Sequence, residues 1–334
     1  MPIPNGRCGA APLDPAMTPD PALTPAPASP TAIRCHGLVK RYADVVAVNG
    51  LDLAVLRGEC FGLLGPNGAG KTTTIEILEG LTEPDAGEVE ILGSTWTRNA
   101  KELRERLGIS LQETQLNEKL TVGETVLLFR SFYKNGRDPE DVMARLSLDE
   151  KRDARVGKLS GGQKQRLAVA CALAGDPEVL FLDEPTTGLD PQSRLELWHQ
   201  VMDFRAGGGT VLLTTHYMDE AERLCDRVAI VDRGKVIALG TPVELISSLH
   251  AANVIEFASE PEIGEADLRA LPGVAEPHRR GPNWSLPVNS LAETVPPLLA
   301  LVERSGARLV NLSTHRATLE DLFVSLTGRA LRED

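Results

Sequence analysis

The segment GPNGAGKT, residues 65–72, constrains the fold of this chain more than any other stretch. It matches the pattern G-x-x-x-x-G-K-[ST] and lies between the apolar run CFGLL and the helical run GKTTTIEILEGL. A strand, a glycine-rich loop and a helix in this order form a phosphate-binding loop, in which backbone N–H groups surround phosphate oxygens at the N-terminus of the helix. An ordinary glycine-rich turn is the alternative, and the strand before the loop and the helix after it argue against that reading.

We therefore predict that this loop binds a nucleotide. Lys71 is expected to reach the β- and γ-phosphates, and the hydroxyl of Thr72 is expected to ligate Mg²⁺. The predicted nucleotide-binding residues of the loop are Gly65, Pro66, Asn67, Gly68, Ala69, Gly70, Lys71, Thr72 and Thr73.

Strand-like and helical runs alternate along most of the chain. The apolar runs VLFLD, TVLLTT, RVAIVD and KVIAL are separated by helical patterns, which indicates a mainly parallel α/β sheet. Strand-like runs ahead of the phosphate-binding loop suggest an added antiparallel β part, and helical patterns dominate from about residue 122 to 173. We predict one α/β domain over residues 31–248, with a helical subdomain at about 113–175, and a small accessory α+β domain over residues 249–334.

Composition bounds the class of protein. Residues 1–30 contain nine prolines, so we predict a disordered Pro/Ala-rich arm there. The net charge of −12 disfavours a nucleic-acid partner. The five scattered cysteines favour small buried side chains in a reducing compartment over a metal or disulfide role. No apolar run approaches the roughly 18 residues of a membrane span and no secretory signal is present, so the cytoplasm is the expected compartment.

Two carboxylates end the apolar run VLFLDEP, residues 179–185. A parallel strand presents its C-terminal end to the ligand crevice, so we expect Asp183 to hold Mg²⁺ and Glu184 to act as general base for an attacking water. The alternative for Glu184 is a solvated turn residue. His216 ends the run VLLTTH in the same way. We expect its imidazole to contact the γ-phosphate, and the alternative is an ordinary turn histidine.

Two further side chains are candidates for the same crevice. Gln112 follows a short strand-like run, where its amide could sense the metal or the water and move with the helical region after it. Glutamine is also common at strand ends. Tyr42 could stack on adenine, a contact worth about 1–3 kcal/mol for base–aromatic pairs. A half-buried aromatic residue in a strand is the rival interpretation of Tyr42.

The stretch LSGGQ, residues 159–163, begins a helix in an unusual way. Ser160 and Gln163 have the spacing of a capping box, yet Gly161 and Gly162 occupy the first turn, where each costs on the order of 1 kcal/mol relative to alanine. A helix N-terminus attracts anions, and two glycines let a phosphate approach the backbone without meeting a Cβ. Because the phosphate-binding loop already holds this chain's nucleotide, we predict that residues 160–163 bind the nucleotide of a second copy. The predicted assembly is a homodimer that encloses two ATP molecules.

In this order, the motifs resemble those of the ATP-binding subunits of ABC transporters, over about residues 32–245. The resemblance implies a P-loop ABC ATPase fold and identifies the family's motifs at these positions: the A-loop aromatic at Tyr42, Walker A at 65–72, the Q-loop at Gln112, the signature at 159–163, Walker B at 179–185, the D-loop at 188–190 and the switch histidine at His216.

The resemblance also implies an activity and a setting. It implies ATP hydrolysis with Mg²⁺, with Glu184, His216 and Gln112 in catalytic roles and Gln112 also near the metal, and it adds Asp190 of the D-loop as a nucleotide contact. It implies a separate transmembrane permease as partner, and hence a peripheral position at the cytoplasmic face of the cell membrane.

The C-terminal stretch TLEDLFVSLTG resembles the end of drug-exporter ATPases of the daunorubicin-resistance type, over about residues 250–330. This looser resemblance implies export of a hydrophobic drug or lipid-like molecule. An amphipathic helix that packs only its own domain, and a helix with a dimer-contact or regulatory role, are both compatible with the stretch.

Two rival functions deserve comparison with the transporter subunit. A soluble ATPase of the same family that acts on nucleic acid or ribosomes usually has two cassettes or a long coiled coil between the Walker motifs. This chain has one cassette and no sustained heptads between Lys71 and Asp183. A non-hydrolysing regulatory subunit is disfavoured because every catalytic position is filled.

Overall fold

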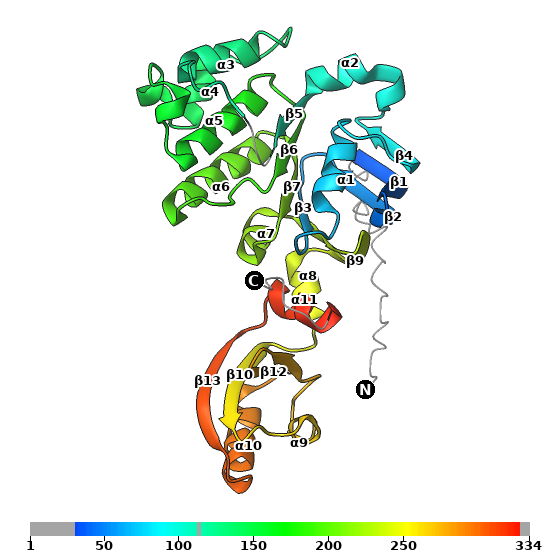
Figure 1. The fold of residues 1–334 in the computed structure, drawn as a ribbon, viewed down its shortest axis with the longest axis vertical. Coiled ribbons are helices and arrows are strands. Elements are labelled where there is room, and N and C mark those ends of the chain that lie inside the picture. Colours follow the sequence, from blue (N-terminus) through cyan, green and yellow to red (C-terminus); the bar gives the residue numbers. More distant parts are fainter. Residues whose placement is uncertain (1–30, 112–114, 328–334) are drawn as a thin grey trace, which may run out of the picture. The chain divides into compact units, whose positions relative to one another are not determined.

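The structure is a computed structural model that describes residues 31–111 and 115–327. The predicted arm at residues 1–30 and the candidate Gln112 therefore lie outside the described residues. Within the described ranges the strands form three separate sheets, of six, three and four strands (Figure 1).

The six-stranded sheet forms the centre of the first part of the chain. Its strand order is β5-β6-β7-β3-β8-β9, and only the β8–β9 pair is antiparallel. The prediction of a mainly parallel sheet is therefore confirmed. The strands are β3 (Cys60–Leu64), β5 (Leu107–Ser110), β6 (Val179–Asp183), β7 (Thr210–Thr215), β8 (Arg227–Asp232) and β9 (Lys235–Gly240).

Both faces of this sheet are covered, and every residue of the inner strands β3, β6 and β7 is buried. In β6, Phe181 belongs to the hydrophobic cluster on one face, while Leu180 and Leu182 belong to the cluster on the other, as the alternation of side chains along a strand requires. Helix α1 (Lys71–Leu78) contributes to the first cluster, and the second cluster contains side chains from α5 (Gly161–Leu173), α6 (Pro191–Ala206), α7 (Met218–Leu224) and α8 (Pro242–Ser247).

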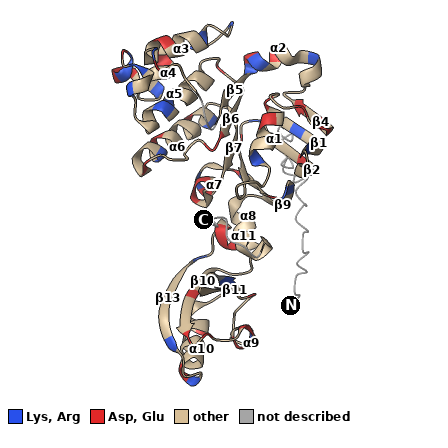
Figure 2. Cartoon of the chain, viewed as in Figure 1, with Lys and Arg blue, Asp and Glu red and all other residues tan. Residues whose placement is uncertain are grey.

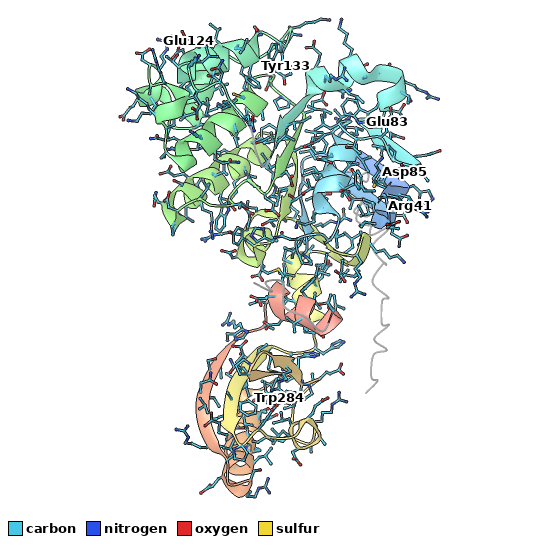
Figure 3. The ribbon with its side chains drawn as sticks, viewed as in Figure 1. Arg41, Glu83, Asp85, Glu124, Tyr133 and Trp284 are labelled. Atoms are coloured by element: carbon cyan, nitrogen blue, oxygen red, sulfur yellow. The ribbon has the colours of Figure 1, made fainter. Side chains whose placement is uncertain are left out.

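The predicted antiparallel part is a three-stranded sheet with the order β2-β1-β4, made of β1 (Thr31–Tyr42), β2 (Val45–Leu56) and β4 (Ala86–Ile91). Asp85 ties the start of β4 to the end of β1, because its carboxylate accepts from the Arg41 backbone N–H at 2.7 Å and from Lys40 Nζ at 3.2 Å; Figure 3 labels Asp85 and Arg41. This sheet contributes to the same hydrophobic cluster as α1, so it packs beside the phosphate-binding loop.

Helix α2 (Trp96–Arg106) follows this sheet and was not among the predicted elements. Its sequence, WTRNAKELRER, has four basic and two acidic residues, and Figure 2 shows blue segments at both ends of the helix. Trp96 anchors its first turn, because the indole N–H donates to the Leu78 carbonyl at 3.0 Å.

The predicted helical region contains α3 (Val122–Arg130), α4 (Pro139–Arg145), two short 3₁₀ turns at Asp149–Lys151 and Val156–Lys158, and α5. The starts of α3 and α4 carry sequence-encoded caps: Thr121 and Glu124 form a capping box on α3, and Asp138 caps α4 ahead of a proline.

The last part of the chain has a four-stranded antiparallel sheet with the order β11-β12-β10-β13 and its own hydrophobic core, in which Trp284 is buried (Figure 3). The element order β-α-β-β-α-β is that of a ferredoxin-like unit. Its elements are β10 (Asn253–Glu260), α9 (Glu265–Arg269), β11 (His278–Arg280), β12 (Asn283–Val288), α10 (Leu291–Arg304) and β13 (Arg308–Arg316).

The final helix, α11 (Leu319–Thr327), does not join this core. Its side chains Leu319, Leu322 and Phe323 belong to the large cluster that contains α5 to α8. Just before it, the Ala317 backbone N–H donates to the Ala252 carbonyl at 3.2 Å, so the chain leaves the four-stranded unit beside the point where it entered. In the described ranges, every helix is too short or too polar to cross a bilayer.

Candidate active site

The phosphate-binding loop, residues 65–70, connects β3 to α1. Two of its glycines are required by close backbone approach: a Cβ at Gly65 would lie 2.2 Å from the Val231 carbonyl oxygen, and one at Gly70 would lie 2.2 Å from the Ala47 carbonyl oxygen. Gly70 is also the N-cap of α1, with a φ of 100°, and no side chain caps this helix. The first N–H groups of α1 are therefore available to an anion, as the loop motif predicts.

Lys71 turns back over this loop. Its side chain is only 4% exposed, and Nζ donates to the carbonyls of Gly65 at 2.9 Å and Pro66 at 3.2 Å. The same amine lies 3.4 Å from Glu184 Oε1. Burial lowers the pKa of Lys71, and the neighbouring carboxylates of Glu184 and Asp183 oppose that effect. The amine that should meet the phosphates is thus held by a carboxylate in this structure.

Glu184 connects the loop to the switch histidine. His216 Nδ1 lies 3.2 Å from Glu184 Oε2, while Lys71 contacts the other carboxylate oxygen. His216, followed by Lys71, lowers the pKa of Glu184 to about 2 against the opposing effect of burial. Glu184 has a φ of 45°, in the left-handed region that a residue with a Cβ rarely adopts. The structure therefore brings together Lys71 from the start of α1, Glu184 from the end of β6 and His216 from the end of β7.

Asp183 and Thr72 are adjacent at the same edge. The Thr72 hydroxyl lowers the pKa of Asp183, although burial raises it overall. One carboxylate and one hydroxyl suit Mg²⁺, which takes few protein ligands and keeps waters and phosphate oxygens for the rest of its shell. The donor set thus fits the predicted metal.

Thr214 is a residue of this site that the sequence analysis missed. Its hydroxyl donates to Asp183 Oδ1 and accepts from the Glu184 backbone N–H at 3.0 Å, and its carbonyl accepts from the same N–H at 3.2 Å. One threonine thereby orients the carboxylate of Asp183 and holds Glu184 in its unusual backbone conformation. The sequence feature that could have indicated it is the pair Thr214-Thr215 directly before His216, which the strand pattern alone explains.

Tyr42 ends β1 at the turn into β2, which carries Ala47 against Gly70. The residue is 45% exposed, and Lys40 Nζ lies 5.5 Å from the ring centroid. An exposed aromatic face beside the phosphate-binding loop is available for stacking on a base.

The signature segment has the predicted cap. The Gln163 backbone N–H donates to Ser160 Oγ at 3.3 Å, and the Ser160 N–H donates to Gln163 Oε1 at 3.0 Å, so the capping box is confirmed. The two glycines of the first turn have different surroundings. A Cβ at Gly161 would meet open space, whereas one at Gly162 would lie 2.4 Å from Ser193 Oγ of α6. Gly162 thus serves helix packing within the chain, and only Gly161 leaves the helix start open to a ligand.

Asp190 serves as the N-cap of α6. Its carboxylate accepts from the backbone N–H groups of Gln192 at 3.1 Å and Ser193 at 3.0 Å, and from Ser193 Oγ at 2.6 Å. These bonds lower the pKa of Asp190. The carboxylate is therefore occupied by its own helix in this structure.

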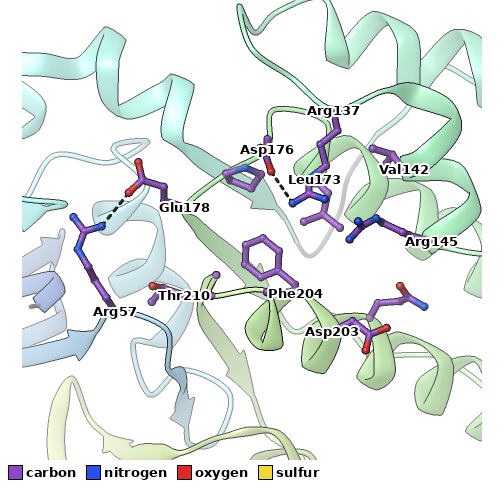
Figure 4. Close-up of a pocket in the computed structure, with 15 residues that line it drawn as sticks. Arg57, Arg137, Val142, Arg145, Leu173, Asp176, Glu178, Asp203, Phe204 and Thr210 are labelled. Atoms are coloured by element: carbon purple, nitrogen blue, oxygen red, sulfur yellow. Dashed lines mark hydrogen bonds and ion pairs between the residues drawn. The ribbon is translucent and has the colours of Figure 1, made fainter. Parts of the chain in front are cut away.

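A cavity of about 360 Å³ lies elsewhere, at the end of the sheet where β7 begins with Thr210 (Figure 4). Two ion pairs lie in its walls: Arg57 lies 3.0 Å from Glu178 and Arg137 lies 2.6 Å from Asp176. The candidate active-site residues are at the opposite ends of the strands, so this cavity is separate from the candidate active site.

Comparison with known proteins agrees with this geometry. Residues 48–187 match the family described as "ABC transporter". The chain is 42% identical over 301 residues to the "Nod factor export ATP-binding protein I" of Burkholderia lata, covering 88% of this chain and 96% of the relative. It is 40% identical over 311 residues to the protein of the same name from Rhizobium sp. (strain N33), covering 91% of this chain and 100% of the relative.

Solved structures show the same fold. An ATP-binding subunit of an ABC transporter superposes with a TM-score of 0.60 at 29% identity, covering 66% of this chain and 94% of the other. An ATP-binding cassette in its ADP conformation superposes with a TM-score of 0.59 at 25% identity, covering 66% and 95%. The chain belongs to the ABC transporter ATP-binding family, with the predicted P-loop ABC ATPase fold. It is an ATP-binding subunit whose activity is ATP hydrolysis.

Proposed function

We propose that this chain powers export through a separate transmembrane permease, with Lys71, Glu184 and His216 at the centre of its ATP site. The observation that carries the proposal is the convergence of these three side chains at the mouth of the phosphate-binding loop, with contacts of 3.4 Å and 3.2 Å to the two oxygens of Glu184.

The residues of this cluster have complementary roles in hydrolysis. Lys71 exchanges the carboxylate of Glu184 for the β- and γ-phosphates of ATP. Glu184 then loses a neighbouring cation, which makes it a better base for the attacking water, and His216 contacts the γ-phosphate. Thr72 and Asp183 hold Mg²⁺, which neutralises phosphate charge when bound. Tyr42 stacks on adenine, and Gln112 completes the site near the metal and the water.

The signature segment indicates a homodimer. Ser160 and Gln163 hydrogen-bond to each other at the start of α5, whereas Lys71 hydrogen-bonds within its own loop at the start of α1. We propose that residues 160–163 of each copy contact the ATP bound by the other copy, with Asp190 at the junction between them.

The surface between α2 and α3 supports a membrane partner. A groove of about 480 Å³, here called the α2–α3 groove, is lined by Trp96, Lys101, Arg104, Phe132 and Tyr133, among others, and Tyr133 is marked in Figure 3. Phe132 is 64% exposed there. An exposed aromatic side chain beside basic residues suits an amphipathic segment of the permease. Docking there places the chain peripherally at the cytoplasmic face of the membrane.

For the cargo we propose a hydrophobic drug or a lipid-like molecule, in line with the resemblance to daunorubicin-type exporters. The relatives named for Nod factor export support the outward direction. We also propose that residues 249–334 form an accessory domain, which α11 fastens to the ATPase domain formed by residues 31–248.

Glu184→Gln tests the active site. The variant should bind ATP but lose nearly all turnover, because an amide cannot accept the proton of the water. It should therefore accumulate as an ATP-bound dimer on size-exclusion chromatography with ATP and Mg²⁺. Undiminished hydrolysis would show that Glu184 is not the base.

Capture of the permease tests the partner. Affinity purification of the chain from detergent-solubilised membranes should recover one permease, and Phe132→Glu should abolish the recovery. Leu299→Glu on α10, a residue with 44% exposure outside the groove, is the matched control and should leave recovery unchanged. Equal recovery with both variants would exclude the α2–α3 groove as the docking surface.

A further inference from the structure

A buried carboxyl lies behind the candidate active site, on α7. Glu220 has no exposed surface, and its Oε1 accepts from Trp198 Nε1 of α6 at 3.0 Å. Burial raises the pKa of Glu220, and the hydroxyls of Thr215 and Thr186 together with Trp198 oppose that effect. A carboxyl this deep in a protein is expected to have a hydrogen bond on both oxygens.

One of the expected hydrogen bonds lacks good geometry. Glu220 Oε2 and Thr186 Oγ1 are both buried without a hydrogen-bond partner. The Thr186 hydroxyl nevertheless lies close enough to the carboxyl to lower its pKa. The two groups are therefore in weak contact, and a small shift of either segment would bring them to good hydrogen-bond geometry.

The two segments are the ones that carry the reacting groups. Thr186 is two residues after Glu184, and the next residue, Thr187, donates from Oγ1 to Glu184 Oε2 at 3.2 Å. Glu220 is on the helix that begins two residues after His216. Thr215, just before His216, accepts from the Tyr217 backbone N–H at 2.9 Å and also faces Glu220. A bond between Thr186 and Glu220 would therefore tie the Glu184 loop to the His216 turn.

We propose that Thr186 Oγ1 donates a hydrogen bond to Glu220 Oε2 in the ATP-bound protein, and that this bond positions Glu184 relative to His216. ATP supplies the shift, because phosphates that take Lys71 release Glu184 from its 3.4 Å contact and free the loop that follows. Thr186 and Glu220 are positioning residues in this scheme. The proposal rests on the roles proposed above for Glu184 and His216.

A matched pair of variants isolates the hydroxyl. Thr186→Ser keeps it and Thr186→Ala removes it, while both delete the same methyl group. In steady-state ATPase assays, Thr186→Ala should lower kcat about tenfold, which corresponds to about 1.4 kcal/mol of barrier, with KM for ATP within about twofold of wild type. Thr186→Ser should keep most of the wild-type kcat. Equal kcat values for the two variants would overturn the proposal.

Glu220→Gln is the second variant of a double-mutant cycle with Thr186→Ala. If the two residues act through one bond, the double variant Thr186→Ala/Glu220→Gln should have the kcat of the worse single variant. If the loss of kcat in the double variant equals the product of the losses in the two single variants, the two residues do not act through a direct bond. Glu184→Gln tests the proposed base independently of Thr186 and Glu220. If that variant loses turnover while the losses of kcat in this cycle are multiplicative, only the Thr186–Glu220 bond is refuted.

A spectroscopic signature needs no substitution at Thr186. Trp198 donates to the same carboxyl, so closure of the bond should change its fluorescence. In Glu184→Gln, which is expected to hold ATP without hydrolysing it, ATP should alter the tryptophan emission, and Trp198→Phe should remove that change. ATP binding with no change assignable to Trp198 would count against the proposal even if the Thr186 variants failed to fold.

Discussion

In the nucleotide-free protein, Glu184 is a stabilising anion as well as the proposed base. Its two oxygens contact Lys71 and His216, and its side chain is only 7% exposed. Glu184→Gln keeps the shape and removes the charge, so Lys71 remains buried without its anionic partner. We therefore expect the variant to unfold more easily than wild type when no nucleotide is present.

The magnitude follows from the pKa of Glu184, which the folded structure lowers from 4.5 to about 2. One pKa unit corresponds to about 1.4 kcal/mol, so the charged form contributes about 3 kcal/mol at neutral pH. Because burial lowers the pKa of Lys71 despite the presence of Glu184, part of this gain offsets the cost of a buried ammonium, and about 3 kcal/mol is an upper value.

The pH dependence has a definite sign. A carboxyl whose pKa is lower in the folded state stabilises the protein above its unfolded pKa of 4.5, and this contribution is lost as the pH falls toward about 2. The free-energy difference between wild type and Glu184→Gln should be constant from pH 7 to about pH 5.5 and shrink below pH 4.5.

Urea unfolding of nucleotide-free protein across this pH range measures the difference. Glu260→Gln is the control, because Glu260 forms only an exposed ion pair with Arg308, with an exposed fraction of 69%, and should change stability little. Equal stability of wild type and Glu184→Gln at pH 7, or a difference that does not shrink in acid, would refute the reasoning.

Three further changes test other parts of the structure. Lys71→Ala should weaken ATP binding strongly in a titration, because the phosphates lose their cation, and wild-type affinity would contradict the loop assignment. Mixing Lys71→Ala with Ser160→Arg should restore ATPase activity above the average of the two separate variants, since about half of the dimers are mixed and at most roughly a quarter of all sites are intact. Control dimers of one wild-type chain and one chain with both changes should be inactive, and half activity there would show that each chain uses its own signature. Gly62→Ala places a Cβ 2.8 Å from Cys225 Sγ and should cost about 1–3 kcal/mol in thermal unfolding, with partial recovery in Gly62→Ala/Cys225→Ala; strict additivity of the two changes would exclude the clash.

The parts of the site predicted from sequence are those fixed by local geometry. A strand, a glycine loop and a helix can be recognised within a dozen residues, and Asp183 and His216 follow because parallel strands end at one edge. The capping box of Ser160 is equally local.

The missed parts depend on packing between distant segments. Gly162 is explained by Ser193, 31 positions further along the chain, and Thr214 is linked to Asp183 only because β6 and β7 are neighbours. Helix α2 could not be predicted from apolar periodicity, because Leu103 is its only buried residue and one buried residue makes no helical pattern.

The hydrogen bond between Ala252 and Ala317 makes the ferredoxin-like unit an insertion rather than a tail. Truncation at residue 248 would also remove Leu319 and Phe323, which are fully buried in the ATPase core, and would leave the Glu222 carboxylate of α7 without the Leu319 N–H that it now accepts at 2.9 Å. Excision of residues 253–316 with a short linker would spare that core, since the two cut ends already meet. The inserted unit is attached to the ATPase domain at both of its ends. A partner that binds this unit can therefore affect the ATPase through two connections, one that enters from α8 and one that leaves into α11.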